Sequence, residues 1–414
     1  LEIGYQERPE LFARHIQKPA PLAEVVVEAR ERVLAGGAVR TPLDEPHLRA
    51  ELGKVRARGI DSVAVLFLHS FAYPAHERAA AAIARELGFN QVSLSHTVAN
   101  EIKAVGRGDT TVADAYLSPM LRSYIGRLQA ALGEDAALRF MQSNGGLADA
   151  RRFTGKDAVL SGPAGGVVAY AHVGRLAGFG KTLGFDMGGT STDVSRFDGR
   201  YERVFETRTA GVRIKAPMMH IETVAAGGGS ILGFECGRFT VGPQSAGADP
   251  GPACYGRGGP PALTDANLVL GRIQPKYFPA CFGHDAKQPL DVHAARTRIG
   301  ELAARAARPQ APMSAEEAAA GFVRIANENM AKPIKEISIG RGYDVREYAL
   351  VCFGGAGPQH ACAIAAALGI RHIVLHPYAG VLSAYGMGIA DMAHAGVRAV
   401  LAPLQREMPR HVAA

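Results

Sequence analysis

The chain has 414 residues, of which 47% are hydrophobic and 21% are charged, so it is long enough for roughly two to three domain-sized units. Its formal net charge is +7, but lysines and arginines alternate with acidic residues and form no basic stripe with aromatic residues. We therefore expect no nucleic-acid partner. No apolar run reaches about eighteen residues, so no membrane span is predicted.

The five cysteines are widely spaced and contain no CxxC pair. This pattern fits neither a disulfide framework nor a structural zinc site, and we expect a cytoplasmic protein. The sequence begins at Leu1 without an initiator Met and without a signal-peptide pattern. We interpret it as an internal fragment of a longer protein.

The first part of the chain alternates between strand-like and helix-like segments, which predicts an α/β sheet. We expect, in chain order, a strand over 61–68, a helix over 74–87, a strand over 91–95, a helix over 112–132 that Pro119 can kink, and a strand over 138–141.

A second α/β block begins near residue 161. Pro163 suits the first turn of a helix that runs through Val173, and glycines follow where this helix should stop. Apolar runs over 182–185 and 194–197 predict two strands of a hairpin. The tip of this hairpin is the string DMGGTSTD, residues 186–193.

Residues 225–272 are unusually rich in Gly and Pro, and we expect a long functional loop there. After it, Ser314 and Glu317 form a capping box for a helix that should end near Lys332, before Pro333. The remaining expected elements are a strand over 348–353, a glycine loop over 354–357, a helix over 359–368 capped by Gly369, and a strand over 372–375.

The hairpin tip has the features that phosphate binding requires. Gly188 and Gly189 allow backbone N–H groups to face phosphate oxygens, and the hydroxyl residues after them add donors. The flanking carboxylates would repel phosphate unless a cation lies between them, and Mg²⁺ prefers such oxygen ligands. The residues assigned to this site are Asp186 and Asp193 for catalysis and the metal, and Gly188, Gly189, Thr190, Ser191 and Thr192 for phosphate.

An ordinary hairpin turn with solvated aspartates is the alternative explanation of this string. Its position between two apolar strands favours function, because the string then resembles the second phosphate motif of actin, sugar kinases and heat-shock chaperone ATPases. No GxxxxGK[ST] loop occurs in the chain, so a Walker-type site is excluded.

Two further glycine loops accompany the hairpin. VCFGGAGP, residues 351–358, has the form of the adenosine motif of those ATPases, and we assign Gly354, Gly355 and Ala356 to the nucleoside. AAGGGS, residues 225–230, fits a turn as well as a site. Its candidate substrate contacts are Gly227, Gly228, Gly229 and Ser230.

Taken in order, the strings SGPAGG, DMGGTSTDVS, AAGGGSI, SAGADPGPACYGRGG, TDANLVLGR and GGAGPQHACAIA resemble the hydantoinase A/5-oxoprolinase family, to which acetone carboxylase subunits are related. The resemblance covers nearly the whole chain and is closest to 5-oxoprolinase. It implies a partial actin-like ATPase (ribonuclease H-like) fold of the α/β class with a glycine-rich inserted segment. It also implies three regions: 1–94 as the remainder of an N-terminal region, 95–395 as the hydantoinase A domain, and 396–414 as the start of a further region.

The resemblance implies an ATP- and Mg²⁺-dependent hydrolase of a cyclic amide, in which phosphorylation of the lactam carbonyl activates the ring for attack by water. A hydantoinase B-like subunit or domain and an oligomeric assembly are the expected partners. The first DxGGT-type phosphate loop of the family is missing here, so this fragment alone is expected to be inactive. Ketone carboxylation and a non-enzymatic chaperone-like module remain alternatives.

Other candidate residues carry less weight. His220, Glu222 and Cys254 meet no zinc spacing, and no base is identifiable beside Cys254, so we expect satisfied loop residues and an inert thiol. His360 begins the helix after the adenosine loop. It could contact a phosphate or an acid there, but the polarity common at a helix start explains it equally well.

Overall fold

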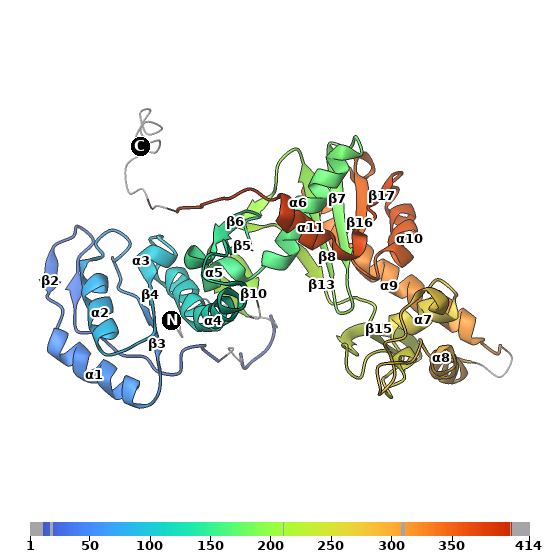
Figure 1. Cartoon of the computed structure of the whole chain (residues 1–414), viewed down its shortest axis with the longest axis horizontal. Coiled ribbons are helices and arrows are strands. Elements are labelled where there is room, and N and C mark those ends of the chain that lie inside the picture. The colour runs from blue at the N-terminus through green and yellow to red at the C-terminus, as the bar shows by residue number, and fades with distance from the viewer. Residues whose placement is uncertain (1–10, 17–19, 210, 308–310, 398, 400–414) are drawn as a thin grey trace. The chain divides into compact units, whose positions relative to one another are not determined.

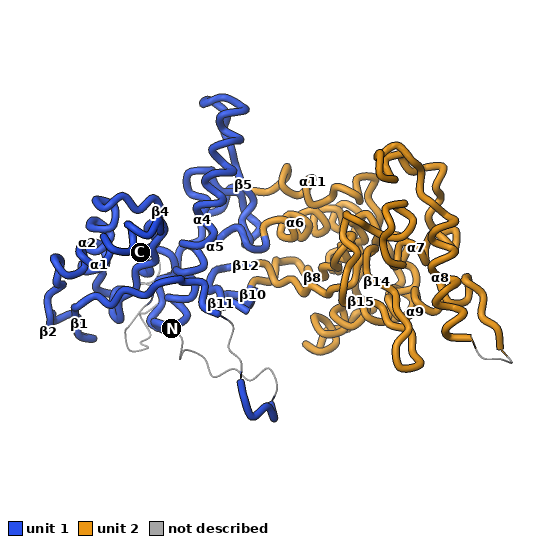
Figure 2. The backbone as a smooth tube through the Cα atoms, turned by 90° about the horizontal axis from the view of Figure 1, so that it is seen from below, with its two compact units in different colours: residues 1–160, 204–218, 392–414 blue, residues 161–203, 219–391 orange. Residues whose placement is uncertain are grey.

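The computed structural model describes residues 11–16, 20–209, 211–307, 311–397 and 399. The chain divides into two compact units, which Figure 2 shows in different colours. Unit 1 comprises residues 1–160, 204–218 and 392–414, and unit 2 comprises residues 161–203 and 219–391. The three regions expected from the resemblance stay a prediction, and most of region 396–414 lies outside the described residues.

Unit 1 is built around a parallel strand pair, β3 (Ser62–Val65) and β4 (Gln91–Leu94). Helices α1 (Glu45–Ala57) and α2 (Ala75–Glu86) share one buried apolar cluster with these strands. The other elements of this unit are β1 (Arg32–Val33), β2 (Val39–Thr41), α3 (Ser95–Val98), α4 (Ala104–Leu132), β5 (Arg139–Met141), β6 (Leu147–Asp149), α5 (Gly155–Ala158), β10 (Thr207–Thr209) and β11 (Val212–Ile214).

Helix α4 begins eight residues before the predicted start at 112 and contains Pro119. Its first turns include Gly106 and Gly108, which are poor helix formers and conceal the helix in the sequence. The hydroxyl of Thr110 donates to the carbonyl of Gly106 at 2.8 Å, and this part of the helix is buried. Burial therefore overrides the weak local propensity here.

Unit 2 contains a five-stranded mixed sheet in the order β13-β8-β7-β16-β17. Strand β8 is antiparallel to both of its neighbours, whereas β7, β16 and β17 are mutually parallel. The strands are β7 (Lys181–Met187), β8 (Thr192–Asp198), β13 (Glu222–Val224), β16 (Ala349–Phe353) and β17 (Ile373–Leu375). Figure 1 shows this sheet between its covering helices.

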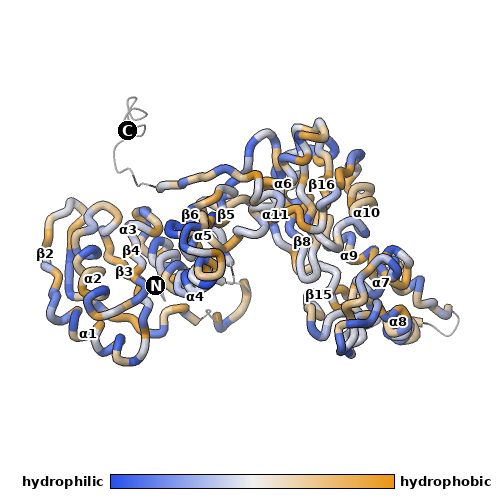
Figure 3. The backbone as a smooth tube through the Cα atoms, viewed as in Figure 1, coloured by the Kyte–Doolittle hydropathy of each residue, from blue (hydrophilic) through white to orange (hydrophobic). Residues whose placement is uncertain are grey.

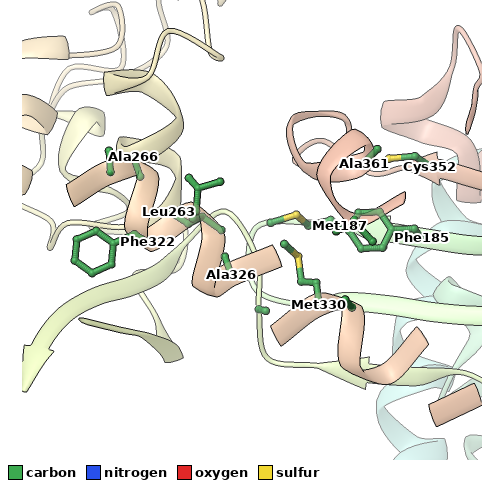
Figure 4. Packing of buried hydrophobic residues seen from close by; sticks show 14 of the residues in the cluster. Phe185, Met187, Leu263, Ala266, Phe322, Ala326, Met330, Cys352 and Ala361 are labelled. Atoms are coloured by element: carbon green, nitrogen blue, oxygen red, sulfur yellow. The ribbon is translucent and has the colours of Figure 1, made fainter. Parts of the chain in front are cut away.

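Alternate residues of β7 face opposite sides of the sheet. Gly184 lies against the ring of Tyr170 on helix α6 (Ser161–Leu176), which itself packs on α11 (Leu382–Ile389). Phe185 and Met187 face the other side, where Figure 4 shows them near Met330 of α9 (Ala315–Ile337). Helix α10 (Pro358–Leu368) completes that side.

The glycine-rich segment contains more regular structure than the sequence predicted. It forms a hairpin of β14 (Ser230–Glu235) and β15 (Arg238–Ser245), a short 3-10 turn and helix α7 (Leu263–Val269). Helix α8 (Val292–Ala306) follows. Short strands β9 (Arg203–Val204) and β12 (Met218–Met219) lie where the chain passes between the units.

Helix α9 begins with the predicted capping box, in which Glu317 N donates to Ser314 Oγ at 3.1 Å. Its predicted end was wrong, because the helix continues through Pro333 to Ile337. Pro333, Ile334 and Ile337 are buried, so packing compensates for the hydrogen bond that proline cannot donate.

No helix among the described residues is both long enough and apolar enough to span a membrane. Figure 3 shows the reason, since hydrophilic residues interrupt the hydrophobic stretches along the helices.

The crossing of α6 and α11 depends on glycine. A Cβ added to Gly386 would lie 1.9 Å from the carbonyl oxygen of Gly165, whereas one added to Gly388 meets nothing within 4 Å. We expect Gly386→Ala to lower the free energy of unfolding by about 1–3 kcal/mol through overpacking. The matched control Gly388→Ala should be neutral or stabilise by up to about 1 kcal/mol. Equal midpoints of the two variants in urea unfolding would contradict this.

Candidate functional site

Three glycine loops that are far apart in the sequence meet at one end of the unit 2 sheet. The tip of the β7–β8 hairpin is the first loop, and the chain after β16 is the second. Ala356 N donates to Met187 O at 3.0 Å, which ties the second loop to the first. The third loop follows β13, and its Gly228 N and Gly229 N donate to Gly188 O and Gly189 O at 3.0 and 2.6 Å.

The close approach of these loops requires glycine at two positions. Gly354 has a φ of +79°, and a Cβ there would lie 2.4 Å from Met187 O and 2.5 Å from Asp186 Oδ1. A Cβ on Gly227 would lie 2.7 Å from the backbone of Gly189. These glycines therefore allow backbone to contact backbone, which is the role expected of glycine at a ligand loop.

Asp186 and Asp193 are directly opposite each other in the β7–β8 register, so their side chains project from the same face. This is the face that α6 and α11 cover. Ser383 Oγ of α11 donates to Asp186 Oδ2 at 3.5 Å, and Thr223 Oγ1 of β13 donates to Asp193 Oδ1 at 2.6 Å. The structure thus brings together the two carboxylates that the sequence assigned to catalysis and a cation.

Both carboxylates lie in a site that disfavours their ionised forms. Burial, followed by the negative charge of Asp193, raises the pKa of Asp186 to about 6. Burial also raises the pKa of Asp193, although the hydrogen bond from Thr223 opposes this shift. A cation between the carboxylates would remove the repulsion that raises the pKa of Asp186.

The first and second loops carry exposed backbone donors. Gly189, Thr190 and Gly355 are exposed loop residues, and their N–H groups make no backbone hydrogen bond within the described part of the chain. A Cβ added to Gly189 or Gly355 would meet nothing within 4 Å, so open space lies beside both residues. These N–H groups are available to an anionic ligand.

Other predicted contacts are already engaged by the protein. Thr192 is fully buried and its hydroxyl donates to Ala226 O at 2.5 Å. Gly227 N donates to Ser230 Oγ at 2.9 Å, and Gly228 and Gly229 bond to the hairpin as described. The AAGGGS loop therefore braces the hairpin tip, and its substrate role, like the phosphate role of Thr192, stays a prediction.

Asp265 of α7 orders the segment SAGADPGPACYG. Its buried carboxylate accepts hydrogen bonds from Ala253 N, Cys254 N and Ala262 N at 3.0, 2.7 and 2.8 Å. Burial, together with the charge of Asp265, raises the pKa of the Cys254 thiol, so the thiolate is disfavoured. This agrees with the inert thiol expected from the sequence.

His360 connects the start of α10, after the loop that follows β16, to the rest of unit 2. Its ring is fully buried between Asn327 Oδ1, 2.7 Å from Nδ1, and Asn267 Nδ2, 3.1 Å from Nε2. Burial, followed by the charge of Arg272, lowers the pKa of His360 to about 4. The ring is therefore neutral near pH 7 and holds α7, α9 and α10 together.

His220 is not part of a metal cluster. Its Nε2 lies 3.2 Å from Glu222 Oε1 and 3.0 Å from the guanidinium of Arg341, and Asp249 is exposed. Burial, then the charge of Arg341, lowers the pKa of His220. No group of three or more His, Cys, Asp or Glu side chains that could hold a metal ion occurs among the described residues.

Sequence reasoning missed the residues that support the site. Ser383 and Thr223 bond to the carboxylates, and the carbonyl of Ala379 accepts a hydrogen bond from Gly354 N at 3.0 Å. They come from α11, β13 and the turn before α11, and no motif spacing marks them. Only the folded sheet places them beside Asp186.

The raised pKa of Asp186 predicts how stability depends on pH. Between about pH 4 and pH 6 the folded chain binds more protons than the unfolded chain, so this group lowers stability as pH rises through that window. Without Mg²⁺, Asp186→Asn should raise the free energy of unfolding at pH 7.5 by an amount on the order of 3 kcal/mol, and should change it little at pH 4.

Urea unfolding at both pH values measures this difference, with Glu336→Gln on the exposed face of α9 as the control. An equal effect of Asp186→Asn at both pH values would contradict the burial and repulsion described for Asp186.

Known proteins share both the sequence and the fold of this chain. 5-Oxoprolinase 1 of Arabidopsis thaliana is 47% identical over 95% of the chain, and the match covers 33% of that protein. Caprolactamase subunit alpha of Pseudomonas jessenii is 36% identical over 92% of the chain and is covered over 54% of its length. The chain thus spans about a third of the 5-oxoprolinase and about half of the caprolactamase subunit.

Solved structures are similar to most of the chain. The ATP-dependent caprolactamase from Pseudomonas jessenii has a TM-score of 0.76 at 33% identity, covering 94% of this chain and 57% of that one. Nucleotide-free acetone carboxylase has a TM-score of 0.74 at 25% identity, covering 88% and 52%. Residues 1–88 match the hydantoinase/oxoprolinase N-terminal region and residues 107–396 match the hydantoinase/oxoprolinase model. The chain belongs to the hydantoinase/oxoprolinase family.

Proposed function

We propose that this chain is part of an ATP-dependent enzyme that hydrolyses a cyclic amide, with 5-oxoproline or a hydantoin as substrate. The observation that carries the proposal is the meeting of three glycine loops beside two facing carboxylates at one end of the unit 2 sheet. The names of the relatives, 5-oxoprolinase and ATP-dependent caprolactamase, agree with this chemistry.

The sheet of unit 2 supports an actin-like, ribonuclease H-like fold for the nucleotide-binding part. Four strands run in one direction and β8 runs against them, with helices on both faces. In this sheet the β7–β8 hairpin and the loop after β16 lie together. These are the places where such a fold holds phosphate and nucleoside.

The residues present fit a magnesium nucleotide. The exposed N–H groups of Gly189 and Thr190 and the hydroxyl of Ser191 would bind phosphate oxygens, because a nest of N–H groups attracts anions. Gly188 N already donates to Ser191 O at 3.0 Å, so the phosphate role of Gly188 stays a prediction. A Cβ on Gly355 would meet nothing within 4 Å, so a nucleoside could approach the backbone there. Gly354 and Ala356 contact the hairpin instead, and their nucleoside role stays a prediction. Asp186 and Asp193 would hold Mg²⁺, which retains several waters and so needs only one or two carboxylates.

ATP supplies the phosphoryl group that converts an inert amide into an activated imidate. The chain's contribution is to position the phosphates and to neutralise charge, which provide most of the catalysis in phosphoryl transfer. Water then adds to the activated carbon, and the C–N bond breaks as the nitrogen takes up a proton, which leaves an acyl phosphate. A second water attacks the same carbon and releases phosphate and the open-chain amino acid. In this scheme Asp186 and Asp193 position the metal and water.

A partner chain or domain belongs to the proposal. The relative from Pseudomonas jessenii is named as an alpha subunit, and a hydantoinase B-like subunit or domain is the corresponding partner here. Ketone carboxylation is the second candidate, because the acetone carboxylase structure covers 88% of this chain. The loops described above bind the nucleotide and do not choose between acceptors.

Binding of Mg²⁺-ATP tests the nucleotide site directly. Calorimetry should show binding to a chain extended at its N-terminus to the length of the relatives. Asp186→Ala should abolish this binding or weaken it by about tenfold or more, because the metal ligand is lost. Gly227→Ala should have an effect of the same size, because the added methyl group displaces the hairpin tip. The control Gly300→Ala, whose Cβ meets nothing within 4 Å, should bind as the parent does. If the extended parent does not bind Mg²⁺-ATP, the proposed nucleotide site is contradicted.

The fate of the carbonyl oxygen tests the chemistry. With the extended chain and its partner, 5-oxoproline labelled with ¹⁸O at the ring carbonyl should transfer label to phosphate when the carbonyl oxygen is phosphorylated and water attacks carbon. Mass spectrometry of the released phosphate measures this transfer. Unlabelled phosphate with all label in the carboxylate would contradict the proposed route, and incubation without ATP is the control.

A further inference from the structure

A cavity of about 1120 Å³ opens within unit 1. Its walls come from residues 96–101, 142, 148, 149, 151, 152, 154, 156, 157, 205, 215–217 and 392–397, all of which belong to unit 1. The segment after Asp391 forms one wall as an extended chain, since Ala393 N donates to Leu147 O at 3.0 Å and Gln142 Nε2 donates to Ala393 O at 2.8 Å.

A histidine and a buried carboxylate form a dyad at this wall. Glu77 of α2 is fully buried, and its carboxylate accepts hydrogen bonds from Phe67 N at 3.2 Å, His96 N at 3.1 Å and the hydroxyl of Ser95. His96 Nδ1 lies 2.5 Å from Glu77 Oε2. Because the carboxylate is the acceptor, Nδ1 carries the ring proton and the lone pair of the neutral ring is on Nε2.

His96 Nε2 has no hydrogen-bond partner among the residues that the structure describes, and His96 lines the cavity. Arg107, which is fully buried, fixes the chain segments next to the dyad. Arg107 Nε donates to Ser95 Oγ at 2.9 Å, and its Nη2 donates to Phe67 O at 2.7 Å. The chain on both sides of Glu77 is thus fixed, as an oriented proton acceptor requires.

The charges around the cavity are mostly paired, which disfavours a polyanionic ligand such as a nucleotide. Apolar side chains, among them Phe205 and Pro217, also line it. The ion pairs on the wall are Lys156 with Asp157, Lys215 with Glu101, and Arg151 with Asp149. A small polar molecule with at most one net charge suits such a surface.

We propose that this cavity is a second ligand site, for a small amide, in which His96 Nε2 accepts a hydrogen bond from the amide N–H while Glu77 orients the ring. The assignment rests on the proposed function, because cyclic amides are the proposed substrates.

Chemical modification of the unmodified sequence tests the site without relying on a variant. Diethyl pyrocarbonate should carbethoxylate His96 at Nε2, and saturating 5-oxo-L-proline should slow this reaction by about tenfold, as read by mass spectrometry of peptides. The exposed His293 of α8 should react at the same rate with and without 5-oxo-L-proline. Equal rates at His96 with and without this probe would overturn the proposal.

Calorimetry on His96→Gln and the control His293→Gln provides the second test. His96→Gln should weaken binding of 5-oxo-L-proline by about tenfold, the loss expected for one hydrogen bond, and His293→Gln should leave it unchanged. Mg²⁺-ATP binding should match the parent in both variants. Because His96→Gln removes the ring that donates to the buried Glu77 carboxylate, its urea unfolding midpoint should fall, and a single cooperative transition shows that the variant is folded.

The two proposals fail in different ways. Unchanged 5-oxo-L-proline affinity in His96→Gln, with normal ATP binding, would overturn the second site and leave the nucleotide assignment standing. Binding of 5-oxo-L-proline that depends on His96 in a protein that never binds ATP would support the second site and contradict the proposed function.

Discussion

The candidate site depends on contact between backbone segments that only glycine permits. The carbonyls of Met187, Gly188 and Gly189 at the hairpin tip accept hydrogen bonds from backbone N–H groups of the two other loops. A single methyl group at Gly227 or Gly354 would meet backbone atoms at 2.7 Å or less. Because no side chain intervenes, the positions of the exposed amides are set by the sheet itself. Two carboxylates can then be kept together, at an electrostatic cost, within a rigid frame.

The rest of unit 2 supports this frame from two sides of the sheet. On one face, α6 and α11 cross at Gly165 and Gly386 and bring Ser383 to Asp186. On the other face, α7, α9 and α10 are joined through the neutral ring of His360. The motif TDANLVLGR is explained by these contacts, since Asp265 fixes the preceding loop and Asn267 reaches the histidine. Most of the glycine-rich strings are thus part of the architecture of one site.

The sequence predicted the central elements well where local signals were strong. Apolar runs identified β7, β16 and β17, and the capping box identified the start of α9. It failed where tertiary packing outweighs local propensity, as in α9 beyond Pro333, in the first turns of α4, and in the β14–β15 hairpin inside a glycine-rich stretch. The meeting of Asp186 with Ser383, or of Glu77 with His96, has no local signature, because such pairs exist only after distant segments pack.

Unit 1 is assembled from three separate stretches of chain, the last of which begins at Met392. Residues 392 and 393 pair with Leu147, which lies some 245 residues earlier in the sequence. During synthesis on the ribosome, the wall of the unit 1 cavity that these residues provide cannot form until all of unit 2 has been translated. The order of biosynthesis therefore makes completion of this cavity a late event, after the sheet and loops of unit 2 have had time to fold.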